Sequence, residues 1–210
     1  MPEPGLRERK KRLTKQSIAD SAFALFAEYG FDKVTVAQIA RQAGVSEATV
    51  FNYFPAKEDL VYFRMEAFED GLLTAIRRRP AGRSIVDAFR DHVLGMGGLM
   101  SAADNEATAG LRAAARIVAD SPALQARERQ IYDQATGSLA GLIRSETSRR
   151  ADDIQPWVAA NALVGVHRAV VSYVREQILS GASVRDVRRR VRRQAERALA
   201  ALTAGLPDVR

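Results

Sequence analysis

The sequence predicts an all-α protein of about nine helices, and three observations support this prediction. Apolar residues recur at spacings of three and four positions along most of the 210 residues, as on one face of a helix. Glycine and proline fall between these periodic stretches, and residues that cap helices stand just before them. No stretch alternates apolar and polar residues in the manner of a half-buried strand. We therefore expect no sheet, and the chain has no internal repeat.

The first expected helix covers residues 13–29. Its apolar positions lie at helical spacing, Thr14 can cap its start, and Gly30 can end it. The residues before it, 1–12, are strongly basic and lack apolar periodicity. We expect them to form a flexible basic arm.

Two short helices are expected next. Thr35 can cap a helix over residues 36–43, which ends at Gly44, a residue able to adopt the left-handed conformation of a sharp turn. Ser46 can then cap a third helix of about nine residues, because Pro55 interrupts it.

Six longer helices are expected in the rest of the chain. Ser84 and Ser121 can cap two of them, and Pro122 suits a first helical turn. We place the six at residues 57–77, 85–100, 105–119, 122–142, 154–179 and 183–203.

Composition narrows the possible functions. The chain has 47% apolar and 27% charged residues, as ordinary globular proteins do, and it has no cysteine. Its two histidines, His92 and His167, are far apart in the sequence, so we expect neither a metal site nor a cofactor. An enzyme is disfavoured, because there is no glycine-rich phosphate loop and no nucleophile with a recognisable histidine partner. No apolar run approaches the ~18 residues of a membrane span, and the N-terminus lacks a signal core, so we expect a cytoplasmic protein.

The formal net charge of +7 is concentrated in two clusters. Either cluster suits a polyanion such as nucleic acid, but a charge run is commonly a solvated face, and we favour that interpretation for the second. The first cluster consists of Arg7, Arg9, Lys10, Lys11, Arg12 and Lys15; the second consists of Arg185, Arg188, Arg189, Arg190, Arg192, Arg193 and Arg197.

The two short helices, joined through "AGVS", have the signature of a helix-turn-helix. Ala40 is small where the helices come close, Gly44 makes the turn, and Val45 closes the corner. At ~100° per residue, Val50 and Phe54 of the third helix point the same way, toward the first helix. The opposite side of the third helix is left facing outward.

That outward side suits duplex DNA. The helix is short enough to lie in a ~12 Å major groove, and the N–H groups of Ser46, Glu47 and Ala48 carry the positive end of its dipole. Asn52 could pair with adenine through its amide, a contact worth ~1–3 kcal/mol of discrimination.

The neighbouring side chains add further contacts. Phe51 could touch a thymine methyl, and the Tyr53 hydroxyl could reach a phosphate. The roles of two residues remain open at this point. Glu47 could accept from a cytosine amino group or only stabilise the helix dipole, and Thr49 could contact DNA or be a surface threonine.

These residues resemble the DNA-binding region of TetR/AcrR-type repressors. The resemblance is carried by "TVAQIARQAGVSEATVFNYFPAKEDL" and the preceding "SIADSAFALFAEYGFDKVTV", and it spans about residues 13–62. Ala56 replaces the serine that is usual after Phe-Pro in the family, and Phe51 stands where tyrosine is frequent. The resemblance implies that Thr35 and Tyr53 contact phosphates. It also implies that Thr49, Phe51 and Asn52 face the groove. Lys57 would clamp the DNA backbone.

The resemblance also implies an organisation and a function. A flexible arm (1–12) would precede a DNA-binding domain (13–55) and a larger ligand-binding and dimerisation domain (56–210). The arm could follow the minor groove or only increase solubility. The expected function is that of a repressor that binds a palindromic operator as a homodimer and is released by a small-molecule effector. The alternative is a helical scaffold or sensor that uses its helix-turn-helix for protein contacts.

A homodimer is expected because one helix-turn-helix reads few base pairs, whereas two reading helices ~34 Å apart read a palindrome. In the family, the last two helices form a four-helix bundle across the two-fold axis. The expected interface consists of small residues on the first of these helices and an apolar stripe on the second: Ala159, Ala162, Gly165, Ala169, Val184, Val187, Val191, Ala198 and Leu202.

Candidates for an effector pocket are the polar or bulky side chains that interrupt the apolar stripes. They are His92, Met96, Met100, Arg112, Arg116, Trp157, His167 and Tyr173. Each also has a structural explanation, since a histidine beside an apolar face is usually a satisfied core residue. The two arginines favour an anionic effector and the methionines a hydrophobic one, and the sequence does not decide between them.

Overall fold

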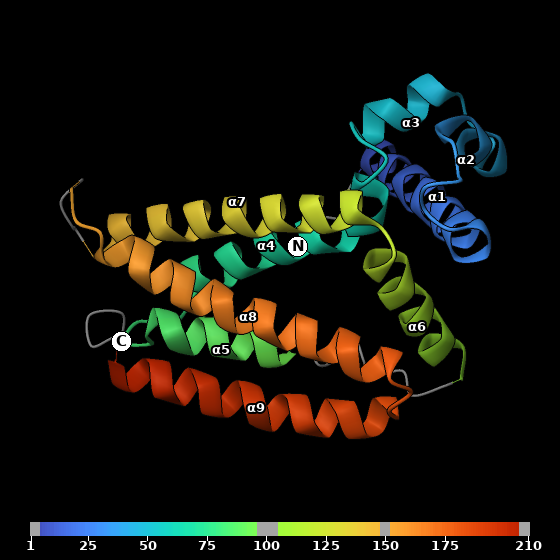
Figure 1. Ribbon diagram of the computed structural model, residues 1–210. Coiled ribbons are helices and arrows are strands. Elements are labelled where there is room, and N and C mark those ends of the chain that lie inside the picture. Colours follow the sequence, from blue (N-terminus) through green and yellow to red (C-terminus); the bar gives the residue numbers. More distant parts are fainter. Residues whose placement is uncertain (1–4, 96–104, 148–151, 206–210) are drawn as a thin grey trace. The chain divides into compact units, whose positions relative to one another are not determined.

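The computed structural model describes residues 5–95, 105–147 and 152–205 (Figure 1). Within these ranges the chain forms nine helices and no strand, so the predicted all-α fold is confirmed. The helices are α1 (Leu6–Tyr29), α2 (Val36–Ala43), α3 (Glu47–Tyr53), α4 (Asp59–Arg77), α5 (Ile85–Gly95), α6 (Asn105–Ala119), α7 (Pro122–Glu146), α8 (Gln155–Leu179) and α9 (Val184–Gly205).

Helix α1 begins earlier than we expected. It starts at Leu6, so much of the expected flexible arm is helical, and Thr14 lies inside the helix instead of capping it. Gly5 occupies the N-cap position and supplies no side-chain hydrogen bond. Leucine, arginine, lysine and glutamate are strong helix formers, and Glu8 stands four residues before Arg12, a spacing that supports helices. Charge alone was therefore a poor guide to disorder here.

The chain divides into two compact units, which are described separately. The first unit comprises Met1–Glu66 and Arg116–Arg127, and the second comprises Ala67–Ala115 and Glu128–Arg210. We expected the DNA-binding domain to end at residue 55. The compact unit that contains those helices continues into α4 and includes the corner where α6 ends and α7 begins, which we call the α6–α7 corner (Arg116–Arg127).

The core of the first unit is built mainly from apolar side chains of α1, α2 and α3. Its fully or almost fully buried members include Ile18, Ala22, Phe26, Phe31, Val34, Ile39, Val50 and Phe54. The rings of Phe26 and Phe31 lie 5.0 Å apart, which joins the end of α1 to the connection before α2. This core fixes which side of α3 faces inward.

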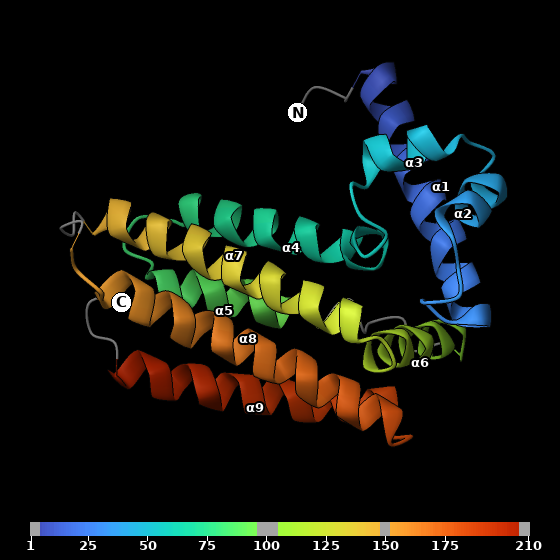
Figure 2. The same cartoon turned by 45° about the horizontal axis from the view of Figure 1, so that its top comes forward.

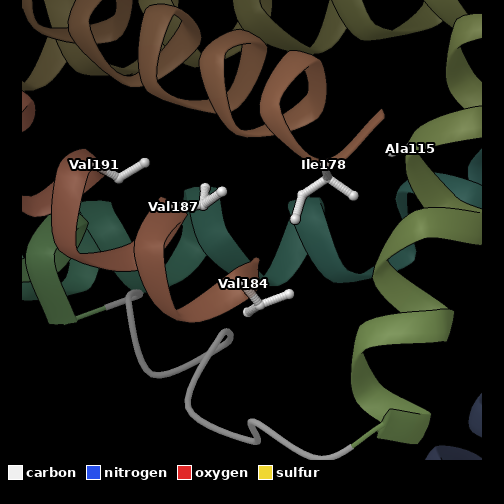
Figure 3. Packing of buried hydrophobic residues seen from close by; sticks show 5 residues of the cluster. All are labelled: Ala115, Ile178, Val184, Val187 and Val191. Atoms are coloured by element: carbon white, nitrogen blue, oxygen red, sulfur yellow. The ribbon is translucent and has the colours of Figure 1, made fainter. Parts of the chain in front are cut away.

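In the second unit, α8 and α9 run side by side and α5 packs against both (Figures 1 and 2). The start of α9 packs against the end of α8 and against α6, as Figure 3 shows. The cluster consists of Ala115, Ile178, Val184, Val187 and Val191. Val187 is fully buried there, so this part of α9 is held by the chain's own core.

Helix α8 is unusually apolar along its length. It is the one described helix that is long and apolar enough to cross a membrane by length and composition. One side of it is buried in the second unit, including Ala159, Leu163 and His167. Core helices of globular proteins meet the same criteria, so this property is weak evidence for a membrane span.

Candidate nucleic-acid interface

Local hydrogen bonds fix the start of α2 and the corner between α2 and α3. Thr35 and Gln38 form a capping box: the Thr35 side chain accepts from the Gln38 N–H at 3.3 Å, and the Gln38 side chain accepts from the Thr35 N–H at 2.8 Å. Gly44 then adopts φ 67° and ψ 33°, the left-handed conformation predicted for it. The N–H of Val45 donates to the carbonyl of Ala40 at 3.0 Å, which closes the turn.

Helix α3 is anchored through its inward face. Ser46 caps the helix by accepting from the Thr49 N–H at 3.1 Å. Val50 is 1% exposed and Phe54 is 2% exposed, as predicted from the helical spacing. The Phe54 ring meets Phe63 edge-on at 5.7 Å, and the Lys15 ammonium lies 5.2 Å from the centre of the Phe54 ring. These contacts fix the orientation of α3 about its own axis, so the same face always points inward.

The opposite face of α3 lies in solvent. Glu47, Ala48 and Asn52 are exposed, as is Ser46, and the Phe51 side chain is 48% exposed. Thr35 at the start of α2 is also exposed. Six of the nine residues expected to contact bases or phosphates are therefore exposed.

Two of the expected contact residues are only partly exposed. Tyr53 and Thr49 are half-buried. The Thr49 hydroxyl lies 2.8 Å from the Ser46 hydroxyl, so the two side chains share a hydrogen bond in the absence of DNA. A DNA contact from Thr49 would have to replace or extend this bond.

Lys57 is placed differently from what the resemblance implied. Its Nζ donates to the backbone carbonyls of Phe31 at 3.0 Å and Val34 at 3.1 Å, and it lies 4.1 Å from the centre of the Phe31 ring. Two of the three ammonium donors are thus used inside the protein, and the charge lies over an aromatic ring. The structure therefore gives Lys57 a fold-stabilising role, because it holds the connection between α1 and α2. Its expected contact with the DNA backbone stays a prediction.

The α6–α7 corner is attached to the start of α4 by contacts that the sequence did not predict. The Asp59 carboxylate is 4% exposed and pairs with Arg127, whose Nε and NH2 atoms lie 2.9 and 2.8 Å from its Oδ1. Tyr62 donates its hydroxyl to the Leu124 carbonyl at 2.8 Å. Asp59 and Arg127 are 68 positions apart in the sequence, so no local pattern relates them. The one signal in the sequence is that each charged residue lies within an amphipathic stretch.

The second unit contains a buried polar cluster on α7 and α8. Tyr132 and His167 are 6% and 5% exposed, and their rings lie 5.9 Å apart. Burial lowers the pKa of His167 to about 4, with a further contribution from His92. Burial, and then Glu128, raise the pKa of Tyr132. The Tyr132 hydroxyl has no hydrogen-bond partner in the described part of the chain, which is an unusual state for a buried phenol.

The other expected pocket residues are scattered. His92 on α5 is half-buried, and its ring lies against Gly71 of α4, where an added Cβ would meet the His92 Cε1 atom at 3.1 Å. Tyr173 packs at the edge of the α9 cluster. Arg112, Arg116 and Trp157 are exposed, while Met96 and Met100 lie outside the described residues. The structure thus brings His92 and His167 into the interior and leaves the two arginines in solvent.

The residues expected at a dimer interface separate into two sets. Val184, Val187, Val191 and Ala159 are buried within the chain, which corrects the expectation that this apolar stripe faces a partner. Gly165 and Ala169 of α8 are exposed, and Ala162, Ala198 and Leu202 are half-buried. An apolar stripe on a helix looks the same in a sequence whether it meets the chain's own core or a second copy.

A short helix fixed by a glycine corner, with a buried inner face and a polar and aromatic outer face, defines a helix-turn-helix DNA-binding protein. Comparison with known proteins extends this. The family profile described as "Bacterial regulatory proteins, tetR family" matches residues 18–62. The transcriptional regulator TcmR of Streptomyces glaucescens is 30% identical over 169 residues, which cover 80% of this chain and 74% of TcmR. The regulator LuxR of Vibrio harveyi is 51% identical over 47 residues, 22% of this chain and 23% of LuxR.

Solved structures agree with this assignment at the level of the fold. The complex of SmeT with triclosan superposes with a TM-score of 0.56 at 21% identity, covering 92% of this chain and 91% of the other. NalD of Pseudomonas aeruginosa gives a TM-score of 0.54 at 17% identity, covering 89% and 97%. The chain belongs to the tetR family of bacterial regulatory proteins. It is a DNA-binding transcriptional regulator and not an enzyme.

Proposed function

We propose that this protein is a cytoplasmic repressor that binds a palindromic operator as a homodimer and leaves it when a small-molecule effector binds. In this proposal the first unit reads DNA and the second unit dimerises and binds the effector. The observation that carries the proposal is the outward face of α3, where Phe51 and Asn52 lie exposed beside a firmly anchored inner face.

The DNA-reading part is tested with a palindromic fragment from the region upstream of the gene. Asn52→Ala removes an amide that can pair with adenine, and the expected loss of specific affinity is ~1–3 kcal/mol. Gln134→Ala removes an exposed amide from α7 and is the matched control. The measurement is operator affinity at several salt concentrations, with an unrelated duplex for comparison. Indifference of the wild-type protein to DNA would favour a protein-contacting role for the helix-turn-helix.

The dimerisation part is supported by the exposed face of α8. Trp157, Val158 and Leu179 are 45%, 44% and 43% exposed, and the small residues Gly165 and Ala169 lie between them in the sequence. Exposed apolar side chains along a helix mark surfaces that meet a partner, and small residues allow a close approach. We place the dimer contact on this face.

A charge introduced on this face tests the dimer. Ala169→Glu places a carboxylate in the proposed contact, and the dimer should dissociate at micromolar protein concentration. Ala201→Glu adds the same charge at an exposed position of α9 and should leave the dimer intact. Sedimentation velocity measures both. A wild-type protein that stays monomeric would contradict the proposal.

The effector part is supported by the buried polar cluster. The Tyr132 hydroxyl lacks a partner within the described residues, and a ligand that hydrogen-bonds to it would relieve an unfavourable state. Among the structural relatives, SmeT forms a complex with triclosan, and NalD is the secondary repressor of a multidrug efflux pump. These properties are those of SmeT and NalD. We extend to this chain only the idea that a small molecule binds in the second unit.

An effector can release DNA only if it binds a DNA-incompetent conformation more tightly. Helix α4 runs from the first unit into the second, so we propose that it transmits the change. A coupling of ~1–3 kcal/mol would change operator affinity ~5- to 150-fold. Operator affinity measured across a metabolite library tests this, and Tyr132→Phe should weaken the response to a compound that acts through the hydroxyl. If no compound shifts the affinity, the protein binds DNA constitutively.

A further inference from the structure

Helix α9 carries a strongly basic surface that operator reading by α3 does not use. All seven of its arginines are exposed, and we call this set the α9 arginine face: Arg185, Arg188, Arg189, Arg190, Arg192, Arg193 and Arg197. The helix contains no lysine, and its two acidic residues pair locally, Asp186 with Arg189 at 2.9 Å and Glu196 with Arg192 at 3.0 Å. The other five arginines form no ion pair with the described residues.

This concentration of charge is unfavourable for the isolated helix. Several of the arginines stand three or four positions apart, where like charges repel and destabilise a helix. The helix is held in place by its opposite side, where Val187, Ala195 and Leu199 are buried. A surface that serves only solubility usually mixes both signs of charge. A surface of one sign is stabilised when a polyanion neutralises it.

The composition of the face favours phosphate as the complementary group. A guanidinium is always charged and can donate two parallel hydrogen bonds to a phosphate, which a lysine ammonium cannot. A lipid surface fits less well, because a membrane-bound helix needs large exposed apolar anchors, whereas the valines and Leu199 of α9 are buried. The other exposed positions among and after the arginines carry only small or polar side chains: Gln194, Ala200, Ala201 and Ala204.

The face also matches the dimensions of duplex DNA. From Arg185 to Arg197 the helix rises about 18 Å at 1.5 Å per residue. Duplex DNA carries one charge per ~1.7 Å of its axis, so about ten phosphates lie within that length. As a DNA-binding regulator, this protein works where such phosphates are abundant.

We propose that the α9 arginine face is a second, sequence-independent DNA contact, which binds the phosphate backbone of duplex DNA while α3 provides the sequence-specific contact. This contact goes beyond operator recognition. It lets one protein molecule hold DNA through two surfaces of different chemistry.

The test compares three full-length proteins on a 30-base-pair duplex of arbitrary sequence, by fluorescence anisotropy between about 50 and 200 mM salt. The first is the wild type. The second changes four arginines without ion pairs: Arg185→Gln, Arg190→Gln, Arg193→Gln and Arg197→Gln. The third is a matched control with the same loss of charge from exposed arginines elsewhere: Arg77→Gln, Arg78→Gln, Arg112→Gln and Arg129→Gln.

The proposal predicts that the α9 variant binds at least about tenfold more weakly at the low-salt end, with a slope of log K against log salt smaller by about 3. The control variant should stay close to the wild type. A fourth protein with lysine at the same four α9 positions should keep most of the salt slope but bind more weakly than the wild type. Circular dichroism verifies that all four proteins are folded.

Four results would overturn the proposal. Equal losses in the α9 and control variants would show an effect of net charge alone. Unchanged binding in the α9 variant would show that the face does not meet DNA. A change in the sedimentation coefficient of the α9 variant without DNA would assign the face to a second copy of the chain. Loss of binding to vesicles containing phosphatidylserine, with binding to DNA unchanged, would assign it to a membrane. Failure of Asn52→Ala to alter specific affinity concerns α3 alone, so the two contacts are tested independently.

Discussion

Helices α3 and α9 are both amphipathic, but they carry opposite kinds of outward surface. The outward face of α3 has no lysine or arginine and presents Glu47, Ala48, Phe51 and Asn52, whereas that of α9 presents seven arginines. Base edges are distinguished by hydrogen bonds and apolar contacts, and phosphates are bound mainly through charge. The comparison suggests that this protein separates the residues that specify a sequence from residues that add sequence-independent affinity.

The largest expected effect lies on the inner face of α3. Phe54→Ala removes a ring that is 2% exposed and packs against Phe63, so the free energy of unfolding should fall by about 3–5 kcal/mol. Phe51→Ala, three positions earlier, removes a ring that is 48% exposed and should change stability by less than about 0.5 kcal/mol while weakening operator binding. Urea unfolding and operator titration of both variants distinguish the two faces. Equal destabilisation would contradict the facing of α3.

The second unit should lose stability in acid through His167, whereas the first unit contains no histidine. The pKa of His167 is lowered to about 4 in the fold, against about 6.5 in an unfolded chain. Between these values the unfolded chain binds more protons, so stability is complete above about pH 6.5 and falls as the pH approaches 4, by about 3 kcal/mol. His167→Phe should flatten this part of the unfolding profile. A profile unchanged by the substitution would contradict the buried neutral histidine.

Lys57 tests whether a cation of the first unit stabilises the fold or holds DNA. Lys57→Met removes the donor to the carbonyls of Phe31 and Val34, and the free energy of unfolding should fall by about 2 kcal/mol. Lys33→Met, at an exposed position in the same connection, is the control and should have little effect on stability. Thermal unfolding measures both. Unchanged stability of the Lys57 variant with weaker DNA binding would contradict the fold-stabilising role and favour the clamp that the resemblance implied.

A smaller effect on stability is expected from replacing glycines, and its sign should depend on the backbone conformation of the glycine. Gly44→Ala should destabilise the protein by about 1 kcal/mol, because an alanine at φ 67° is strained even though no atom lies within 4 Å of an added Cβ. Gly141→Ala in α7 also meets no atom within 4 Å but has helical geometry, and it should stabilise by about 0.5–1 kcal/mol. Chemical denaturation should show changes in the free energy of unfolding of opposite sign for the two variants. The same sign for both would show that the corner tolerates a side chain.

The smallest effect is expected on α9 itself. Arg192→Ala breaks the exposed pair with Glu196, in which the two side chains are 74% and 44% exposed, and stability should change by no more than about 0.5 kcal/mol. Thermal unfolding at low and high salt measures this. A larger loss would mean that the arginines of α9 stabilise the chain, and the contrast with α3 would then be weaker.

The sequence predicted features that depend on nearby residues. The capping residue Thr35, the left-handed Gly44 and the inward Val50 and Phe54 all follow from spacing and from local conformational preference, and the structure confirms each. Most helix bounds were also predicted closely, with α1 as the main exception, because the helix propensity of its first residues outweighs their charge.

Features that depend on distant residues were not predictable. The pair of Asp59 with Arg127 joins parts of the chain that no local pattern relates. The stripe from Val184 to Val191 was assigned to a partner chain, although it packs on Ile178 within the same chain. The bonds from Lys57 to the carbonyls of Phe31 and Val34 were not predicted either, because such backbone partners cannot be read from the sequence.

The α6–α7 corner has a consequence for chimeric regulators made by exchanging DNA-binding regions between relatives. A graft that ends at residue 55 would leave Lys57 and Phe63 to be supplied by the recipient, although both contact residues of the graft. Ser121, which donates to Asp32 at 3.4 Å, would come from the recipient as well. A transplant that keeps its native support should extend through Glu66 and carry Arg116–Arg127 as a second inserted segment.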